Sequence, residues 1–315
     1  MLIRYVVPTN IPAPGRTVSQ LVQRALNIQR KAAEDLIHSG AVACRGRFIT
    51  QAHIQMKPGD EIEIEFAPQP LRSGNAKASS KDRFEILYDD SELIVVNKPA
   101  GLLTVPTPHR EKNTLQSQIR RWLDRQQPGA SAICVHRLDR GVSGVLVFAK
   151  EVTVADKIRS QFASRKPERK YIAIVQGSIQ TNNGTFRSYL ATDKDLNRYS
   201  VSDSSQGELA ITHFEVTERF GDATFVRVQL ETGRRNQIRV HFAESSHPII
   251  GDPRYRPSQA EHPFWPYKRL ALHAESLSFM HPTSGKEIRI TSSWPQEFRD
   301  FKRQSQKKAG FKRSE

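Results

Sequence analysis

Hydrophobic and polar positions near the start of the chain follow first a helical and then a strand-like period. Apolar side chains recur every three or four residues in two segments and alternate with polar ones in two later segments, which predicts helices over residues 17–26 and 30–38 and strands over residues 42–44 and 61–66. Thr17 and Gln20 form a capping-box pattern at the start of the first helix. We therefore predict a small N-terminal α/β domain of residues 1–66.

The next segment has almost nothing to bury. Residues 67–82 contain Pro68, Pro70 and Gly74 among Ser, Ala and Lys, a composition typical of flexible linkers. The linker predicts that the domains on either side of it can move independently.

Strand-like and helical periods interleave beyond the linker. The predicted strands cover residues 86–88, 93–96, 145–150, 171–175 and 225–230, and the predicted helices cover residues 115–123 and 154–162. This pattern predicts a larger domain of mixed α and β structure over residues 83–300. Residues 301–315 form a basic tail, which we expect to be disordered from Lys302 to Arg313.

The charge balance narrows the choice of partners. The chain has 48 Lys and Arg against 33 Asp and Glu, a net charge of +15 with a pI near 10.0, and such an excess attracts polyanions. A membrane surface is the alternative, but the chain lacks a run of about 18 apolar residues and its first eight residues are too short for a signal peptide. We expect a soluble, cytoplasmic protein that binds nucleic acid.

The cysteines indicate neither a disulfide framework nor a zinc site. Cys44 and Cys134 are the only two, and they lie far apart without Cys-x-x-Cys spacing. Reduced thiols suit a cytoplasmic setting, and we expect no bound metal.

Candidate chemistry concentrates in the stretch from His136 to Gly144, where Asp139 stands between two arginines before a Gly-rich turn. The flanking guanidinium groups favour the ionised carboxylate and partial burial opposes ionisation, which is how a carboxylate nucleophile or base is prepared. The alternative is that Asp139 caps a turn or forms a structural ion pair. Metal binding by His136 and Asp139 is disfavoured because no further ligands recur at suitable spacing.

Four blocks together resemble the motifs of the RluA-type pseudouridine synthases. They span about two thirds of the chain, and in order they are residues 92–102, residues 136–144, residues 169–177, and residues 230–241 with 247–252. Three positions depart from the usual pattern: Val142 replaces Thr, Arg169 replaces Lys, and Asn236 replaces His. The Arg-for-Lys change keeps the charge but alters its geometry.

The resemblance implies a fold, a reaction and roles for individual residues. The fold would be α+β, with a mixed, largely antiparallel sheet, flanking helices and a catalytic cleft. The reaction would isomerise uridine within RNA to pseudouridine, without a cofactor, after the target base is flipped out. The implied catalytic residues are Asp139, Tyr171 and Arg239.

In this scheme Asp139 attacks the sugar or removes its neighbouring proton, and Arg239 forms the ion pair that keeps it ionised. Tyr171 stacks on or hydrogen-bonds the uracil, although its ring could equally be a core aromatic. If the segment around Arg239 is extended, Gln237 and Arg239 point to the same face.

Four more residues are expected to contact the substrate or shape its site. Arg137 would fill the gap left by the flipped base, and His136 would position the turn without titrating. Lys98 is a candidate phosphate contact, with a surface lysine as the alternative, and Arg234 completes the set.

The N-terminal domain resembles in layout the αL RNA-binding domain first described in a small-subunit ribosomal protein. Its candidate phosphate contacts are Arg24, Arg30, Lys31, Arg45 and Arg47, and the alternative is an ordinary solvated charged face. An αL-type domain favours large-subunit ribosomal RNA as the partner and transfer RNA as the second choice. We expect a monomer.

Two other classes of protein fit some of these features. A non-catalytic RNA-binding ribosome-assembly factor would use the same basic surfaces, but it would be expected to lose Asp139, Tyr171 or Arg239. A glycosidase or nuclease would need a second placed carboxylate, and no motif offers one. The aromatic loop of residues 256–269 could stack on unpaired bases or pack on the core.

Overall fold

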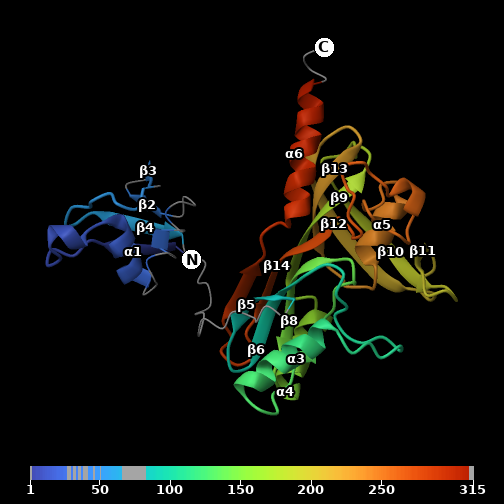
Figure 1. The fold of residues 1–315 in the computed structure, drawn as a ribbon, viewed down its shortest axis with the longest axis horizontal. Helices are drawn as coiled ribbons and strands as arrows, with labels where there is room; N and C mark the ends of the chain where they lie inside the picture. The colour runs from blue at the N-terminus through green and yellow to red at the C-terminus, as the bar shows by residue number, and fades with distance from the viewer. Residues whose placement is uncertain are drawn as a thin grey trace. The chain divides into compact units, whose positions relative to one another are not determined.

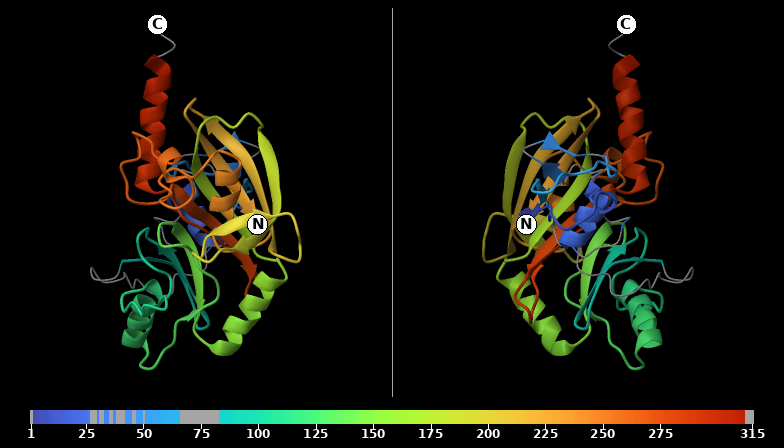
Figure 2. Two further views of the ribbon diagram at one scale, coloured as in Figure 1. Left: turned by 90° about the vertical axis from the view of Figure 1, so that its right-hand side faces the viewer. Right: turned by 90° about the vertical axis from the view of Figure 1, so that its left-hand side faces the viewer.

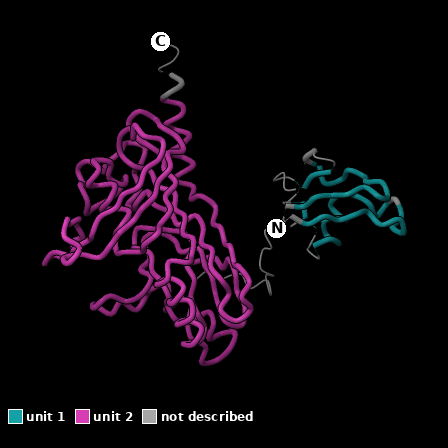
Figure 3. The backbone as a smooth tube through the Cα atoms, turned by 180° about the vertical axis from the view of Figure 1, so that it is seen from behind, with its two compact units in different colours: residues 1–69 teal, residues 70–315 magenta. Residues whose placement is uncertain are grey.

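A computed structural model describes residues 2–26, 30, 33, 34, 37, 42–44, 47–49, 51–65 and 83–311. The chain divides into two compact units, an N-terminal unit of Met1–Gln69 and a C-terminal unit of Pro70–Glu315 (Figure 3). The predicted linker of residues 67–82 lies outside the described residues.

The N-terminal unit is a four-stranded antiparallel sheet with a helix packed on it. The strand order is β1-β4-β2-β3, with β1 (Leu2–Val6), β2 (Val42–Cys44), β3 (Arg47–Phe48) and β4 (Glu61–Glu65). A 3-10 turn η1 (Ala13–Gly15) precedes α1 (Val18–Leu26). The predicted capping box is confirmed: Gln20 N–H donates to Thr17 Oγ1 (3.3 Å), and Thr17 N–H donates to Gln20 Oε1 (3.2 Å).

The second predicted helix falls largely outside the described residues. Those that are described within residues 30–38 are helical, and two of them, Ala33 and Ile37, are fully buried. The alternation does not predict β1, which pairs along its whole length with β4.

The C-terminal unit is built on one eleven-stranded sheet (Figure 1). Its main path runs β11-β10-β12-β13-β9-β14-β8-β6-β5, with β15 paired to β14 and β7 to β8. All of these pairings are antiparallel except that of β14 with β8. The strands are β5 (Glu85–Asp89), β6 (Leu93–Lys98), β7 (Ile133–Cys134), β8 (Ser143–Ala149), β9 (Glu168–Gln176), β10 (Asn183–Thr192), β11 (Arg198–Val201), β12 (Glu208–Arg219), β13 (Ala223–Leu230), β14 (Leu272–Met280) and β15 (Glu287–Thr291). The expected mixed, largely antiparallel α+β fold is confirmed.

Helices flank this sheet at both of its ends (Figures 1 and 2). They are α3 (Leu115–Gln126), α4 (Val152–Ala163), α5 (Gln237–Glu244) and α6 (Gln296–Phe311), with a short 3-10 turn η2 (Pro257–Gln259). The helices predicted over residues 115–123 and 154–162 are α3 and α4. No helix among the described residues has the length and apolar character that a membrane crossing needs.

The C-terminal helix and the aromatic loop form part of the core. Phe298 and Phe301 of α6 are fully buried, and the Trp265 ring meets Phe298 edge-on with centroids 5.3 Å apart. The expected disorder from Lys302 to Arg313 is therefore wrong as far as Phe311, because apolar side chains just before the basic run anchor the helix. Burial of Trp265 at 5% exposure favours core packing over base stacking for this loop.

A close approach between strands fixes the start of β8. Gly144 has φ +118°, and a Cβ at this position would lie 2.2 Å from the carbonyl oxygen of Ala274 on β14. Only glycine allows this contact, which makes the parallel β14–β8 pairing possible. The start of β8, and with it the turn before β8, is thereby held against β14.

Candidate active site

Asp139 lies in the turn that leads into β8, and hydrogen bonds to the main-chain carbonyls of the residues before and after it fix that turn. Thr104 Oγ1 donates to the Leu138 carbonyl (2.7 Å), and the Gly101 N–H donates to the Arg140 carbonyl (2.7 Å). Leu138 is buried beneath the turn, whereas the Asp139 side chain keeps 26% of its surface exposed. The carboxylate is therefore held in place and open to a ligand.

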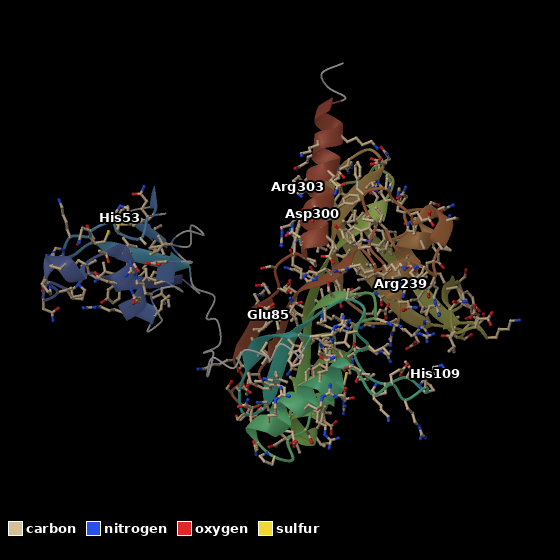
Figure 4. The ribbon with its side chains drawn as sticks, in the orientation of Figure 1. His53, Glu85, His109, Arg239, Asp300 and Arg303 are labelled. Carbon is tan, nitrogen blue, oxygen red and sulfur yellow. The ribbon has the colours of Figure 1, made fainter. Side chains whose placement is uncertain are left out.

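The predicted ion pair with Arg239 is present. Arg239 Nη1 lies 3.0 Å from Asp139 Oδ2, and the same nitrogen is 3.3 Å from the side-chain oxygen of Asn236. Arg239 belongs to α5, and Figure 4 shows it in the middle of the C-terminal unit. The Arg239 side chain is only 10% exposed, so solvent screens this pair weakly.

A second carboxylate, which the sequence did not assign, holds Arg239 from behind. Asp252 accepts two bonds from Arg239, from Nε (2.7 Å) and from Nη2 (2.8 Å), and its side chain is fully buried. Burial alone would lower the pKa of Arg239, but the bonds to Asp252 and Asp139 raise it well above its ordinary value. The guanidinium thus bridges two acids and presents Nη1 to Asp139.

The segment that carries Arg239 is helical, not extended. Asn236 adopts a left-handed conformation (φ 57°), and α5 begins at Gln237. Gln237 turns toward the sheet, where its Nε2 donates to the Ile211 carbonyl (2.9 Å) and its Oε1 accepts from the Arg234 N–H (2.9 Å). The expectation that Gln237 and Arg239 share a strand face is wrong, because the bonds of Gln237 to β12 and the loop start a helix where the sequence alternates.

A pocket of about 360 Å³ opens beside the turn. Its walls include parts of the turn, of β9, of the end of α4 and of the loop after β13, and they bring together His136, Arg137, Phe162, Arg169, Tyr171 and Arg234. Tyr171 is 8% exposed; burial raises its pKa, Arg169 opposes that shift and Asp139 adds to it. The neutral phenol therefore faces a pocket large enough for one flat heterocycle.

His136 is held as a neutral ring at the pocket wall. Its ring stacks on Phe162 with centroids 4.6 Å apart, and its Nε2 accepts from the Val147 N–H (3.3 Å). Burial lowers the pKa of His136 to about 3, and Arg169 adds to the shift. The ring is therefore neutral at physiological pH, and the role of His136 in positioning the turn stays a prediction.

Sequence and structure comparisons place the chain in a family. A family model described as RNA pseudouridylate synthase matches residues 92–244. The uncharacterized RNA pseudouridine synthase YlyB of Bacillus subtilis is 32% identical over 276 residues, which are 86% of this chain and 88% of that protein. The chain belongs to the RNA pseudouridine synthase family. The resemblance drawn from the four motifs is confirmed, and the protein is an isomerase.

Two further matches agree with this family. Ribosomal large subunit pseudouridine synthase D of Zymomonas mobilis is 30% identical over 291 residues, 90% of each chain. The solved structure of human RNA Pseudouridylate Synthase Domain Containing 4 has a TM-score of 0.57 at 23% identity, and the match covers 69% of this chain and 91% of that one. The latter likeness supports the pseudouridine synthase fold of the C-terminal unit.

Lys98 is not a surface lysine. The side chain is fully buried, and its Nζ donates to the carbonyls of Leu102 (2.8 Å), Pro99 (3.0 Å) and Arg140 (3.4 Å). Burial lowers the pKa of Lys98 to about 7, although the charge of Asp139 opposes the shift. The surface-lysine alternative is therefore wrong, because main-chain carbonyls surround the ammonium behind the catalytic turn, and the role of Lys98 as a substrate contact stays a prediction.

The two other predicted substrate contacts lie at the pocket rim. Arg137 is exposed, and Arg234 donates from Nε to the Leu209 carbonyl (3.1 Å) and pairs with Glu208 (2.8 Å). Among the described residues no group of three or more His, Cys, Asp or Glu is arranged to hold a metal ion.

The structure describes only part of the proposed RNA-binding set in the N-terminal unit. Arg24 is exposed at the end of α1, and Arg30 is exposed and pairs with Glu34 at 2.7 Å. Lys31 and Arg45 lie outside the described residues, as does the side chain of Arg47, whose backbone belongs to β3. Their role in RNA binding stays a prediction.

Proposed function

We propose that this protein converts specific uridines of large-subunit ribosomal RNA to pseudouridine, with Asp139 as its essential carboxylate. The observation that carries the proposal is the chain of charges Asp139–Arg239–Asp252 beside the pocket that Tyr171 and Arg137 line. The Asp139 carboxylate is partly exposed, and the Asp252 carboxylate is buried and holds the guanidinium that pairs with Asp139.

The arrangement supplies what the isomerisation needs. The C1′–N1 bond breaks with its electron pair going to the uracil, while an Asp139 oxygen bonds C1′ or removes the 2′ proton. After the base rotates, C5 forms the bond to C1′, the Asp139 bond or proton is returned, C5 loses its proton and N1 gains one. Substrate and product have the same atoms, so the balance needs no co-reactant.

Asp139 must be ionised on either route. Arg239 Nη1 lies 3.0 Å from Asp139 Oδ2, so a positive charge is in place beside this carboxylate. Asp252 keeps Arg239 aimed at Asp139, so that the arginine does not have to reorganise during the reaction.

A uridine stacked in a helix cannot reach this pocket, so the proposal includes base flipping. Arg137 is exposed next to the turn and is suited to occupy the space that the extruded base leaves. Tyr171 offers its ring to the uracil from the pocket wall.

Ribosomal RNA is the favoured substrate because three observations agree. The net charge is +15, the N-terminal unit exposes Arg24 and Arg30, and a relative aligned over 90% of the chain is named as a ribosomal large subunit enzyme. Transfer RNA is the second candidate, and cytoplasmic action is part of the proposal.

The test is to map pseudouridine across total RNA. RNA from cells that lack this protein is incubated with the purified enzyme, and carbodiimide-dependent reverse-transcription stops are compared before and after. We expect one or a few new stops in large-subunit ribosomal RNA. Stops only in transfer RNA would replace the substrate, and no stops in any RNA would refute the proposal.

A further inference from the structure

Arg169 is a buried cation in the wall of the active-site pocket. It lies on β9 two residues before Tyr171, so the two side chains project from the same face of the strand, and both line the pocket. Arg169 is 8% exposed. Its guanidinium therefore lies where a base beside Tyr171 would meet it.

The bonds of Arg169 leave its charge uncompensated. Nη2 donates to the main-chain carbonyls of Glu231 (3.1 Å) and Leu230 (3.5 Å), and the buried Nε has no hydrogen-bond partner among the described residues. The nearby carboxylates are engaged elsewhere: Glu231 pairs with Arg165 at 3.0 Å, and Glu168 pairs with Lys170 at 2.8 Å.

Burial accordingly lowers the pKa of Arg169 below its ordinary value. A buried cation without an anionic partner costs several kcal/mol, a cost that folding alone gives no reason to retain. Such a group in a pocket is a candidate for contact with a ligand that carries or develops negative charge.

The chain makes room for this guanidinium. A Cβ at Gly233 would lie 2.2 Å from Nη1 of Arg169, and the Phe162 ring centroid lies 5.6 Å from the guanidinium carbon. Residues other than glycine can adopt the backbone conformation of Gly233. Glycine is therefore needed here to leave room for the Arg169 guanidinium and not to form a turn. Arginine also has five donors in a planar fork, of which the two main-chain carbonyls engage only one nitrogen.

We propose that Arg169 donates hydrogen bonds to a carbonyl oxygen of the flipped uracil and stabilises the negative charge that the base acquires when the glycosidic bond breaks. The inference rests on the proposed function. When the C1′–N1 pair moves to the uracil, the charge spreads over N1, O2 and O4. A fixed cation in a poorly hydrated pocket stabilises that charge more than it stabilises neutral uridine.

The first test measures single-turnover pseudouridine formation on the mapped RNA. Arg169→Gln is expected to lower the rate constant by about 100- to 1,000-fold, as loss of one preorganised donor does, while RNA affinity changes by less than about threefold. Arg169→Lys should recover part of the rate. The matched control is Arg227→Gln, which removes an arginine 44% exposed on β13 and should leave the rate unchanged.

Gly233→Ala keeps Arg169 but displaces its guanidinium, so it tests position without removing charge. We expect an intermediate loss of rate with an unchanged melting temperature. A target carrying 4-thiouridine or 2-thiouridine in place of uridine identifies the oxygen, because sulfur is a weak acceptor. One of the two should slow the wild-type enzyme but cause no further loss in Arg169→Gln. If Arg169→Gln turns over at the wild-type rate, or if neither sulfur couples to Arg169, the inference is overturned.

A second test needs no RNA and separates this inference from the proposed function. Barbiturate, a pyrimidine anion at neutral pH, imitates the charged base, and its binding is measured by calorimetry. We expect binding to the wild type and to Arg227→Gln, and at least tenfold weaker binding to Arg169→Gln and Gly233→Ala. Binding that depends on Arg169 in a protein inactive on every RNA would support the pocket and refute the proposed reaction. Equal binding by all variants, or none by the wild type, would overturn the inference.

Discussion

Replacement of Asp252 by asparagine is the sharpest test of how the site is held together. The Asp252 carboxylate is fully buried and accepts four hydrogen bonds, two from Arg239 and two from the main-chain N–H groups of Arg254 (2.9 Å) and Tyr255 (3.1 Å). The amide keeps the shape and one oxygen, but its NH₂ group faces a donor of Arg239, and the negative charge is lost.

The magnitude follows from these contacts. Removing one partner of a buried ion pair destabilises a protein by about 3–5 kcal/mol, and the remaining bond from Arg239 to Asp139 offsets part of that loss, so we expect about 3 kcal/mol. At roughly 2–4 °C per kcal/mol for a domain of this size, Tm falls by about 6–12 °C. Arg239 also loses its fixed position, and a shift of roughly 1 Å costs on the order of 100-fold in rate.

The assay combines differential scanning calorimetry with single-turnover pseudouridine formation. Asp222→Asn is the matched control, because Asp222 is 37% exposed and its pair with Lys308 at 2.7 Å is a surface pair expected to contribute about 0–1 kcal/mol. An Asp252→Asn protein with the Tm and rate of the wild type would refute the idea that Asp252 orients Arg239.

Three further outcomes are expected. Removal of residues 1–66 should weaken binding to the natural RNA, measured by filter binding, and leave the fold of the C-terminal unit intact by circular dichroism; unchanged affinity would count against an RNA-binding role. Phe301→Ala should lower the free energy of unfolding by about 3–5 kcal/mol in urea melts, since the ring is fully buried, and a loss under about 1 kcal/mol would contradict the packing of α6. Burial lowers the pKa of three histidines from 6.5 to about 3 or 4, and they are His136, His241 and His273. The unfolded state therefore takes up more protons below pH 6.5, and the free energy of unfolding should fall on acidification by up to about 4 kcal/mol per pH unit. Tm should fall with it, and a flat Tm from pH 7 to 5 would exclude this trend.

The hydrophobic pattern predicted a strand or helix correctly where the residues of that element alone determine how it packs. The apolar runs before and after the Asp139 turn predict β6 and the fully buried β8, and helical spacing predicts α3. An apolar run becomes a strand that is buried on both faces, and the apolar face of α3 is the face that packs, so neighbouring residues carry enough information.

Long-range contacts decided the elements that the pattern missed. The segment from Gln237 alternates like a strand but is buried on all sides, so no period distinguishes helix from strand, and the bonds of Gln237 to β12 and the preceding loop settle the matter. The basic run after Phe301 consists mostly of charged and polar residues, and for this reason we expected it to be disordered. It continues α6, which Phe298 and Phe301 hold to the core from just before the run.

In the active site, too, the features that depend on long-range contacts could not be predicted from local sequence. Asp139 and Arg239 could be paired in advance only through the family resemblance, since they are far apart in sequence. The burial of Lys98 could not be predicted, because it depends on the carbonyls of Leu102 and Arg140, which only the folded turn brings together. Asp252 sits directly after Gly251 in the last motif, and that adjacency was the one signal that could have marked it as functional.

The measurement that tests the central claim most directly compares the wild type with Asp139→Asn on one large-subunit ribosomal RNA transcript. Pseudouridine is read as carbodiimide-dependent stops, and RNA affinity is measured in parallel. The account predicts stops with the wild type and none with Asp139→Asn, at an affinity within a few fold of the wild type. Stops of equal strength from Asp139→Asn would contradict it.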